Sequence, residues 1–338
     1  MTYRHWPAIA LAALVAASTA AEAQMQSATP PPAPLRVISF DGGWNLPVWA
    51  AQRQGYFEAN RVTVQIAYTP SSGFLVASLF DGKYDVALAL VDNLIAYQEG
   101  QGEAKIPANP DLTVFMSGDG GFLSVVAAPS IHAFADLKGK TLSVDAMTTG
   151  AAFVLRELVT RNGIAEGDVT YVRAGGTANR YKDLLAGKHD ATLLRTPFEL
   201  LAQSRGYHVL ANAEALGPYE GTVGYVRQSF AREHEAQMIG FLKGYKAGLD
   251  FVVDPANRGI AEALLVANIR DMTPALAKQA YDLLLDPQHG LTRDLKPDEK
   301  GIANVLALRS KYATPPKALD DPMKYVDLTW YNKAFGTH

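Results

Sequence analysis

Cysteine is absent from this chain of 338 residues. The protein therefore has no disulfide bond and no cysteine that could carry a lipid, and its folded state must depend on the size of its hydrophobic core. A dominant charge is missing as well, because 31 Lys and Arg are interspersed with 34 Asp and Glu and the net charge is −3. This balance makes nucleic acids and other polyanions poor candidates for partners.

The sequence also lacks an apolar run long enough to span a bilayer. The run at 6–17 follows Arg4 and precedes Ala21-Glu22-Ala23, which offers the small residues that a signal peptidase reads. This pattern predicts a cleaved secretory signal over residues 1–23. The polar, Pro-rich stretch 24–34 then predicts a disordered leader. Without a lipid-modified cysteine, the exported protein is expected to diffuse freely in a periplasm.

Catalytic signatures are missing too. His234-Glu235 begins like a zinc motif, but Met238 stands where the second histidine ligand is needed. No nucleophile elbow, phosphate-binding loop or dinucleotide fingerprint occurs. The seven histidines are scattered, and His189-Asp190 is typical of an ordinary turn. We therefore expect no catalytic residue, no metal site and no cofactor, and we expect that the protein is not an enzyme.

What is present is an alternation of strand-like and helix-like segments over the first two thirds of the chain. The strand-like runs are 35–40, 62–68, 85–90, 112–116, 122–127, 141–144, 169–172, 191–194, 208–210 and 222–226. The last third is helical, over 230–253, 260–267, 274–285 and 297–311. Alternating strands and helices predict an α/β fold with mostly parallel sheets.

The alternation occurs in two blocks, which predicts two lobes. We expect the first lobe to comprise 35–127 together with the helical part 216–338, and the second lobe to comprise 128–215. In open sheets of this kind, ligands bind at the carboxyl ends of the strands.

Five turns that open helices follow predicted strands at that edge. Their candidate ligand-binding residues are Trp44, Asn45, Ser71, Ser72, Asp92, Asn93, Thr148, Thr149, Gly176 and Thr177. The free N–H groups of helix N-termini suit anionic or polar ligand groups. Helix capping alone explains any single one of these turns. Their agreement at one edge of the predicted sheets favours a ligand site.

Three side chains near this edge have two interpretations each. Trp44 follows a Gly-Gly pair and is expected to be exposed, as a stacking wall for a ligand or as a lid on a neighbouring helix. Arg195 follows a strand directly and is a candidate for gripping a carboxylate or sulfonate, or for an ion pair within the protein. Asp92, with Asn93, suits an amine or amide of the ligand, or serves only as a helix cap.

Several motifs resemble a known family. They are GWNLPVWAA at 43–51, GYF at 55–57, GKYDVA at 82–87, the helix 92–99 and FADLKGKTL at 134–142. In this order they resemble the nitrate-, sulfonate- and taurine-binding proteins of ABC importers, a group that also holds proteins that make or bind the thiamine pyrimidine. The resemblance implies a type II periplasmic-binding-protein fold with a ligand in the hinge cleft.

By their places in the motifs, the family's ligand positions fall on Asn45, Ser72, Asp92, Thr149, Thr177 and Arg195. Two departures matter. The loop 41–44 lacks the His or Tyr of many members, and the cysteine-rich motif of the pyrimidine synthases is absent.

The resemblance implies the periplasmic solute-binding component of an ABC importer. We expect a monomer that partners a permease in the inner membrane and binds a sulfonate, an aromatic acid, a pyrimidine-like compound or a nitrate-type anion. Two alternatives remain: a periplasmic ligand sensor, and an enzyme of the same fold in pyrimidine- or menaquinone-precursor synthesis. The secretory signal argues against the enzymes, because their substrates are cytosolic.

Overall fold

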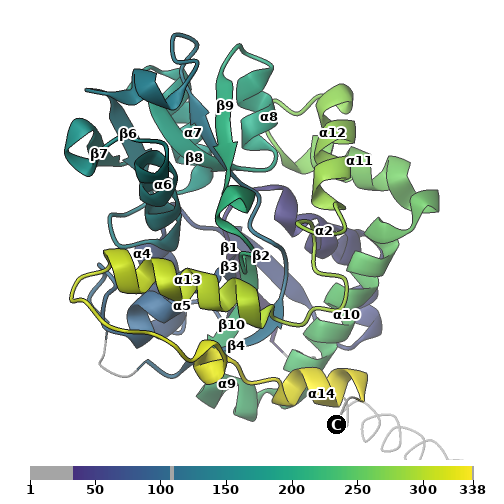
Figure 1. Ribbon diagram of the computed structural model, residues 1–338. Coiled ribbons are helices and arrows are strands. Elements are labelled where there is room, and N and C mark those ends of the chain that lie inside the picture. The colour runs from purple at the N-terminus through teal and green to yellow at the C-terminus, as the bar shows by residue number, and fades with distance from the viewer. Residues whose placement is uncertain (1–32, 107–109, 337–338) are drawn as a thin grey trace, which may run out of the picture. The chain divides into compact units, whose positions relative to one another are not determined.

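Two five-stranded mixed sheets with flanking helices organise the chain (Figure 1). The computed structural model describes residues 33–106 and 110–336, and the residues from Pro34 onward form one compact unit. The predicted signal at 1–23 and nearly all of the predicted leader lie outside the described residues.

The first sheet has the strand order β2-β1-β3-β10-β4. Its strands are β1 (Leu35–Ser39), β2 (Val64–Tyr68), β3 (Val86–Leu90), β4 (Leu112–Ser117) and β10 (Thr222–Arg227). β1 is parallel to β2 and β3, whereas β10 is antiparallel to β3 and β4. All five residues of β3 are apolar and buried, as expected of a strand that is covered on both faces. The helices that follow the parallel strands are α2 (Leu46–Arg53), α3 (Tyr56–Ala59), α4 (Ser72–Phe80) and α5 (Val91–Gln98).

The second sheet has the order β7-β6-β8-β5-β9. Its strands are β5 (Leu123–Ala127), β6 (Thr141–Val144), β7 (Thr170–Arg173), β8 (Ala191–Arg195) and β9 (His208–Asn212). Its helices are α6 (Gly150–Arg161), α7 (Thr177–Leu185) and α8 (Phe198–Gln203). β6, β7 and β8 run parallel, and β5 is antiparallel to β8 and β9. We call each sheet with its helices a lobe.

The chain crosses between the lobes at 118–122 and at 217–221. The first crossing precedes the boundary predicted near 127, because β5 pairs with β8 and β9 of the second sheet. Close packing at this crossing requires a glycine at position 120, since a Cβ on Gly120 would lie 2.7 Å from the backbone oxygen of His289.

The rest of the chain is helical, as predicted. The helices are α9 (Gln228–Glu233), α10 (Glu235–Val253), α11 (Arg258–Asn268), α12 (Pro274–Leu284), α13 (Glu299–Tyr312) and α14 (Thr329–Phe335). Short 3-10 helices are η1 (Gly43–Asn45), η2 (Phe134–Leu137), η3 (Glu166–Asp168), η4 (Ala213–Leu216), η5 (Pro255–Asn257) and η6 (Pro322–Tyr325). α10 packs on α2 and α3, and α13 packs against both α5 of the first lobe and α6 of the second (Figure 1). Along the described ranges, no helix combines enough length with enough apolar character to cross a bilayer.

Candidate functional site

Two adjoining cavities lie between the lobes, where parallel strands of both sheets end. The outer cavity has a volume of about 270 Å³ and is lined by Ser71, Ser72, Gly73, Asn93, Ala96, Tyr97, Gly102, Glu103, Asp145, Ala146, Thr148, Thr149, Arg173, Ala174 and Gly175. The inner cavity has a volume of about 20 Å³ and is lined by Phe40, Leu90, Asn93, Leu123, Asp145, Thr149, Ala151, Thr177, Arg180 and Arg195. Asn93, Asp145 and Thr149 line both cavities. The inner cavity has room for roughly one water molecule, so the lobes are nearly closed upon it.

Helix starts place the hydroxyl groups of the site. Ser71 caps α4 and accepts a hydrogen bond from the backbone N–H of Phe74, and Thr149 caps α6 in the same way for Ala152. Thr177 begins α7 after a turn of two glycines. Each cap occupies the first residues after a parallel strand, so local sequence and sheet topology together direct these groups to the cleft.

Seven of the predicted residues line the two cavities, namely Ser71, Ser72, Asn93, Thr148, Thr149, Thr177 and Arg195. Asn93 stands out among them. The residue is 4% exposed and lines both cavities, and none of the side-chain hydrogen bonds among the described residues involves its amide. A buried amide normally has partners, so Asn93 is available to a ligand.

Asp92 does not line either cavity. Its carboxylate accepts hydrogen bonds from Arg309 Nε at 2.6 Å and Nη2 at 2.5 Å, and from the Gly150 N–H at 2.5 Å. Asp92 and Arg309 are both fully buried. Arg309 also donates to Gln101 Oε1 and to the carbonyl of Thr148. Asp92 therefore joins α5 of the first lobe to α13 and to the N-terminus of α6.

Trp44 is not exposed, contrary to expectation, because it is 2% accessible and packs in the core. The Arg195 guanidinium lies 4.0 Å from the centre of its ring. Arg195 in turn donates to both carboxylate oxygens of Asp119, at 2.8 and 2.9 Å, and to the Gly121 carbonyl and Thr222 Oγ1. Its charge is thus balanced within the protein, at the first crossing between the lobes.

Asn45 and Gly176 also lie away from the cavity walls. The Asn45 amide donates to the carbonyls of Phe40 and Gly42, so it holds the turn after β1. The Gly176 N–H donates to the Pro70 carbonyl across the cleft, and a Cβ at this position would lie 2.9 Å from the Phe40 ring. Both residues shape the site through the backbone.

Asp145 and Arg180 both line the inner cavity, although neither is predicted from the sequence. Asp145 follows β6 directly, so the rule that pointed to Arg195 would have found it. Its Oδ2 accepts from the Ser72 N–H of the other lobe at 3.2 Å, while its buried Oδ1 has no partner among the described residues. Burial raises the pKa of Asp145, and the charge of Arg180 opposes this shift.

Arg180 lies within α7 and is 3% exposed. It donates to the carbonyls of Gly175 and Leu193 and to Thr177 Oγ1, but no carboxylate of the described residues pairs with it. Burial lowers its pKa to about 10, and the charge of Asp145 opposes this shift. Nothing in the local sequence distinguishes this arginine from a surface arginine of an amphipathic helix.

An ion pair crosses the outer cavity between the lobes. Glu103 accepts two hydrogen bonds from Arg173, at 3.0 and 3.1 Å, and one from the Met147 N–H at 2.8 Å. The Arg173 side chain is 63% exposed, so this contact is at the surface. We call Glu103 with Arg173 the clasp.

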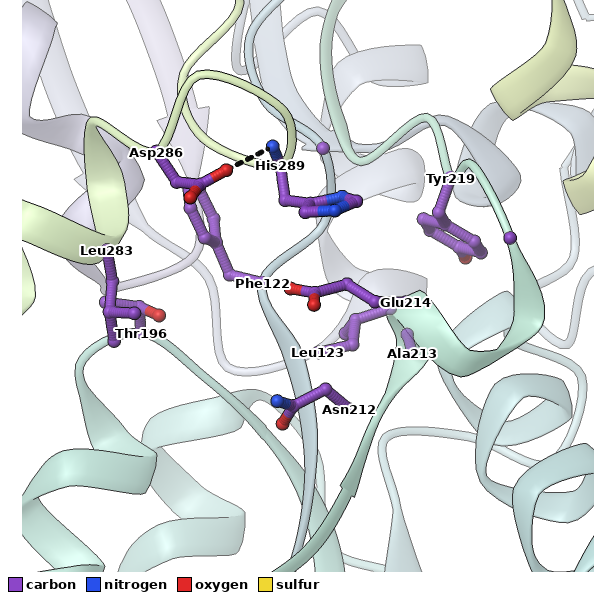
Figure 2. Close-up of a pocket in the computed structure, with 12 residues that line it drawn as sticks. Phe122, Leu123, Thr196, Asn212, Ala213, Glu214, Tyr219, Leu283, Asp286 and His289 are labelled. Carbon is purple, nitrogen blue, oxygen red and sulfur yellow. Dashed lines mark hydrogen bonds between the residues drawn. The ribbon is translucent and has the colours of Figure 1, made fainter.

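Two further cavities lie beside the crossings. Figure 2 shows the smaller one, of about 60 Å³, around Phe122, Glu214 and Tyr219, with the Asp286 carboxylate accepting from the His289 N–H at 2.8 Å. The larger one, of about 670 Å³, shares several of these residues and has mostly acidic polar walls. None of the residues predicted to bind a ligand lines either cavity. Within the described ranges, no group of three His, Asp or Glu is placed to hold a metal ion.

The model of the NMT1/THI5-like family matches residues 45–257, more than half of the chain. No curated protein matches the sequence significantly.

Solved structures share the fold. A protein of Bordetella bronchiseptica RB50 is similar with a TM-score of 0.72 and 20% identity, over 90% of this chain and 97% of that one. The alkanesulfonate-binding protein SsuA of Xanthomonas axonopodis pv. citri, bound to MOPS, has a TM-score of 0.66 and 18% identity, over 82% and 92%. The periplasmic nitrate-binding protein NrtA of Synechocystis PCC 6803 has a TM-score of 0.70 and 10% identity, over 82% and 80%. The predicted periplasmic-binding-protein fold is confirmed.

Proposed function

Since the chain belongs to the NMT1/THI5-like family, we propose that it is a solute-binding protein that holds a small organic ligand in the inner and outer cavities. The observation that carries this proposal is a nearly closed cleft whose walls contain unpaired polar groups from both lobes. The Asn93 amide lines the cleft from the first lobe. Asp145 Oδ1, which is buried without a donor among the described residues, comes from the second. Such groups are costly to bury without partners, and a ligand would supply them.

Binding would proceed by closure of the lobes about the crossings at 118–122 and 217–221. A ligand that contacts both walls stabilises the closed form over the open form by its differential affinity. Several contacts already bridge the lobes in the closed form. They include the Ser72 N–H to Asp145, the Gly176 N–H to Pro70, the Gly150 N–H to Asp92, and the clasp.

The apolar part of the walls favours an organic ligand over a small inorganic anion. Trp44 cannot serve as the stacking wall, because it is buried against Arg195. Phe40, Leu90 and Leu123 provide apolar surface in the inner cavity, and Tyr97 does so in the outer one. Neighbours of the same fold bind alkanesulfonates and nitrate, and a ligand with a polar head and an apolar body suits this cleft better.

Thermal shift over sulfonates, aromatic acids, pyrimidines and nitrate tests the proposal, because a ligand that binds only the native state raises its melting temperature. Titration calorimetry then measures the affinity of each hit. Asn93→Ala is expected to weaken binding at least tenfold, since it removes an available buried amide. Asn268→Ala, on the exposed end of α11, is the matched control and is expected to leave the affinity unchanged. Equal affinity in both variants would remove the cleft as the ligand site.

We further propose that the protein is exported and delivers its ligand to a permease in the inner membrane. The sequence pattern at 1–23 supports export, and the periplasmic neighbours of the same fold support delivery. The mass of the protein purified from a periplasmic fraction tests the first part, with Gln24 expected as the first residue. A preparation that retains residues 1–23 would contradict it.

A further inference from the structure

The charged groups that line the two cavities fall into two kinds. Arg195 is neutralised by Asp119, and Arg173 by Glu103. Asp145 and Arg180 remain, and each charge acts on the other without a direct ion pair. Because these two charges cancel, the closed cleft has no surplus positive charge for an anion.

The two remaining groups differ in what they lack. Arg180 already donates to two carbonyls and a hydroxyl. Asp145 accepts one N–H on Oδ2, while Oδ1 is buried without a donor and the residue is only 8% exposed. A buried carboxylate oxygen without a donor, on a residue that lines a cavity, calls for an N–H or O–H group from whatever fills that cavity. Burial raises the pKa of Asp145, the direction expected of a carboxylate that is short of donors.

We propose that Asp145 determines specificity by accepting a hydrogen bond from an amino or amide N–H of the ligand. The cleft therefore selects an organic molecule with an N–H donor over the analogue that lacks it, and over a simple oxyanion, whose acceptors would face a carboxylate oxygen. This inference rests on the cleft being the ligand site. Rejection of an analogue without the donor is expected to be strong, because binding would leave a buried carboxylate unpaired.

The experiment uses pairs of probes that differ only in the donor: benzoate with 3-aminobenzoate, benzenesulfonate with 3-aminobenzenesulfonate, and pyrimidine with 4-aminopyrimidine. Affinities are measured by titration calorimetry on the full mature chain. At least one amino member is expected to bind at least tenfold more tightly than its partner.

Asp145→Asn separates recognition from a merely structural role. The asparagine keeps an oxygen for the Ser72 N–H and turns its NH₂ group to the cavity. The affinity for the amino probe is therefore expected to fall at least tenfold, while the affinity for the probe without the amino group stays the same or rises. A structural role would weaken both members equally. Asp190→Asn is the matched control, because Asp190 also accepts one backbone N–H, from Thr141, but lies outside both cavities. This control is expected to change neither affinity.

The outcomes distinguish this inference from the proposed function. If the partner without the amino group binds as tightly and is weakened by Asn93→Ala, the cleft is the ligand site and the role of Asp145 is overturned. The role of Asp145 is also overturned if Asp145→Asn binds the amino probe with unchanged affinity. If no probe binds, or if Asn93→Ala leaves the affinity of the probes unchanged, the proposed function itself fails.

Discussion

Asp92 and Arg309 form a fully buried ion pair between residues that are 217 positions apart. Arg309→Met is expected to lower the free energy of unfolding by about 3–5 kcal/mol, because it leaves a buried carboxylate without its cation. Urea unfolding followed by circular dichroism measures this change. Adding Asp92→Leu to Arg309→Met is expected to recover most of the loss, since an apolar pair replaces the ionic one.

The control for the Arg309→Met and Asp92→Leu variants is Lys246→Met, which breaks the surface ion pair with Asp250. Surface pairs contribute about 0.2–1 kcal/mol, so this variant is expected to lose less than about 1 kcal/mol. A similar small loss in Arg309→Met would show that the buried pair is not a main tie between α5, α6 and α13.

Two buried glutamates have raised pKa values, and these values determine how the free energy of unfolding is expected to depend on pH. Burial raises the pKa of Glu220 to about 8 and that of Glu199 to about 7. The native state therefore holds protons that the unfolded chain releases above its ordinary glutamate pKa of 4.5. The resulting stability is complete below pH 4.5 and is lost as pH rises through 7 for Glu199 and 8 for Glu220.

The free energy of unfolding is thus expected to fall by up to about 1.4 kcal/mol per pH unit between pH 7 and 8 through Glu220. Glu220→Gln should flatten this slope, and Glu199→Gln should flatten only the slope below pH 7. Urea unfolding at half-unit steps from pH 5 to 8.5 measures both slopes. A slope between pH 7 and 8 that persists in Glu220→Gln would contradict the assignment.

At the scale of elements, glycines on α10 set how closely this helix packs. A Cβ on Gly248 would lie 2.2 Å from the Pro47 carbonyl of α2. Gly248→Ala is therefore expected to destabilise the protein by about 1–3 kcal/mol, although alanine favours a helix. The measurement is again the free energy of unfolding in urea.

Gly259 in α11 provides the opposite case, because a Cβ there meets no atom within 4 Å. Gly259→Ala is expected to stabilise the protein by up to about 1 kcal/mol through helix propensity alone. The opposite signs of the two Gly→Ala changes are the test. A neutral or stabilising effect of Gly248→Ala would mean that α10 can shift away from α2 at little cost.

At the scale of the whole molecule, the clasp is expected to bias the lobes towards closure. Glu103→Gln removes an ion pair between the lobes, whereas Glu166→Gln removes the comparable two-bond pair with Arg156 inside the second lobe. An exposed pair of this kind contributes at most about 1 kcal/mol, or about a fivefold change in the ratio of closed to open forms. Glu103→Gln alone should therefore enlarge the radius of gyration of the ligand-free protein in small-angle X-ray scattering.

The sequence by itself determined those features that depend on near neighbours. The alternation of strands and helices, the buried strand β3 and the caps at Ser71 and Thr149 all occur where the pattern predicts them. These features follow from side-chain periodicity and from hydrogen bonds to backbone three residues away. Seven predicted residues line the cleft for the same reason, because helix caps that directly follow parallel strands can be recognised from local sequence.

The tertiary structure decided which distant groups meet. An apolar run such as 123–127 fits either sheet, and only its pairing with β8 and β9 assigns it to the second. Arg195 and Asp92 are predicted equally well as ligand contacts, yet each finds a partner far along the chain, Asp119 and Arg309. Asp145 keeps an unpaired oxygen at the cleft instead. The reason is physical: a charge is satisfied by what lies within a few ångströms in space, which local sequence does not specify.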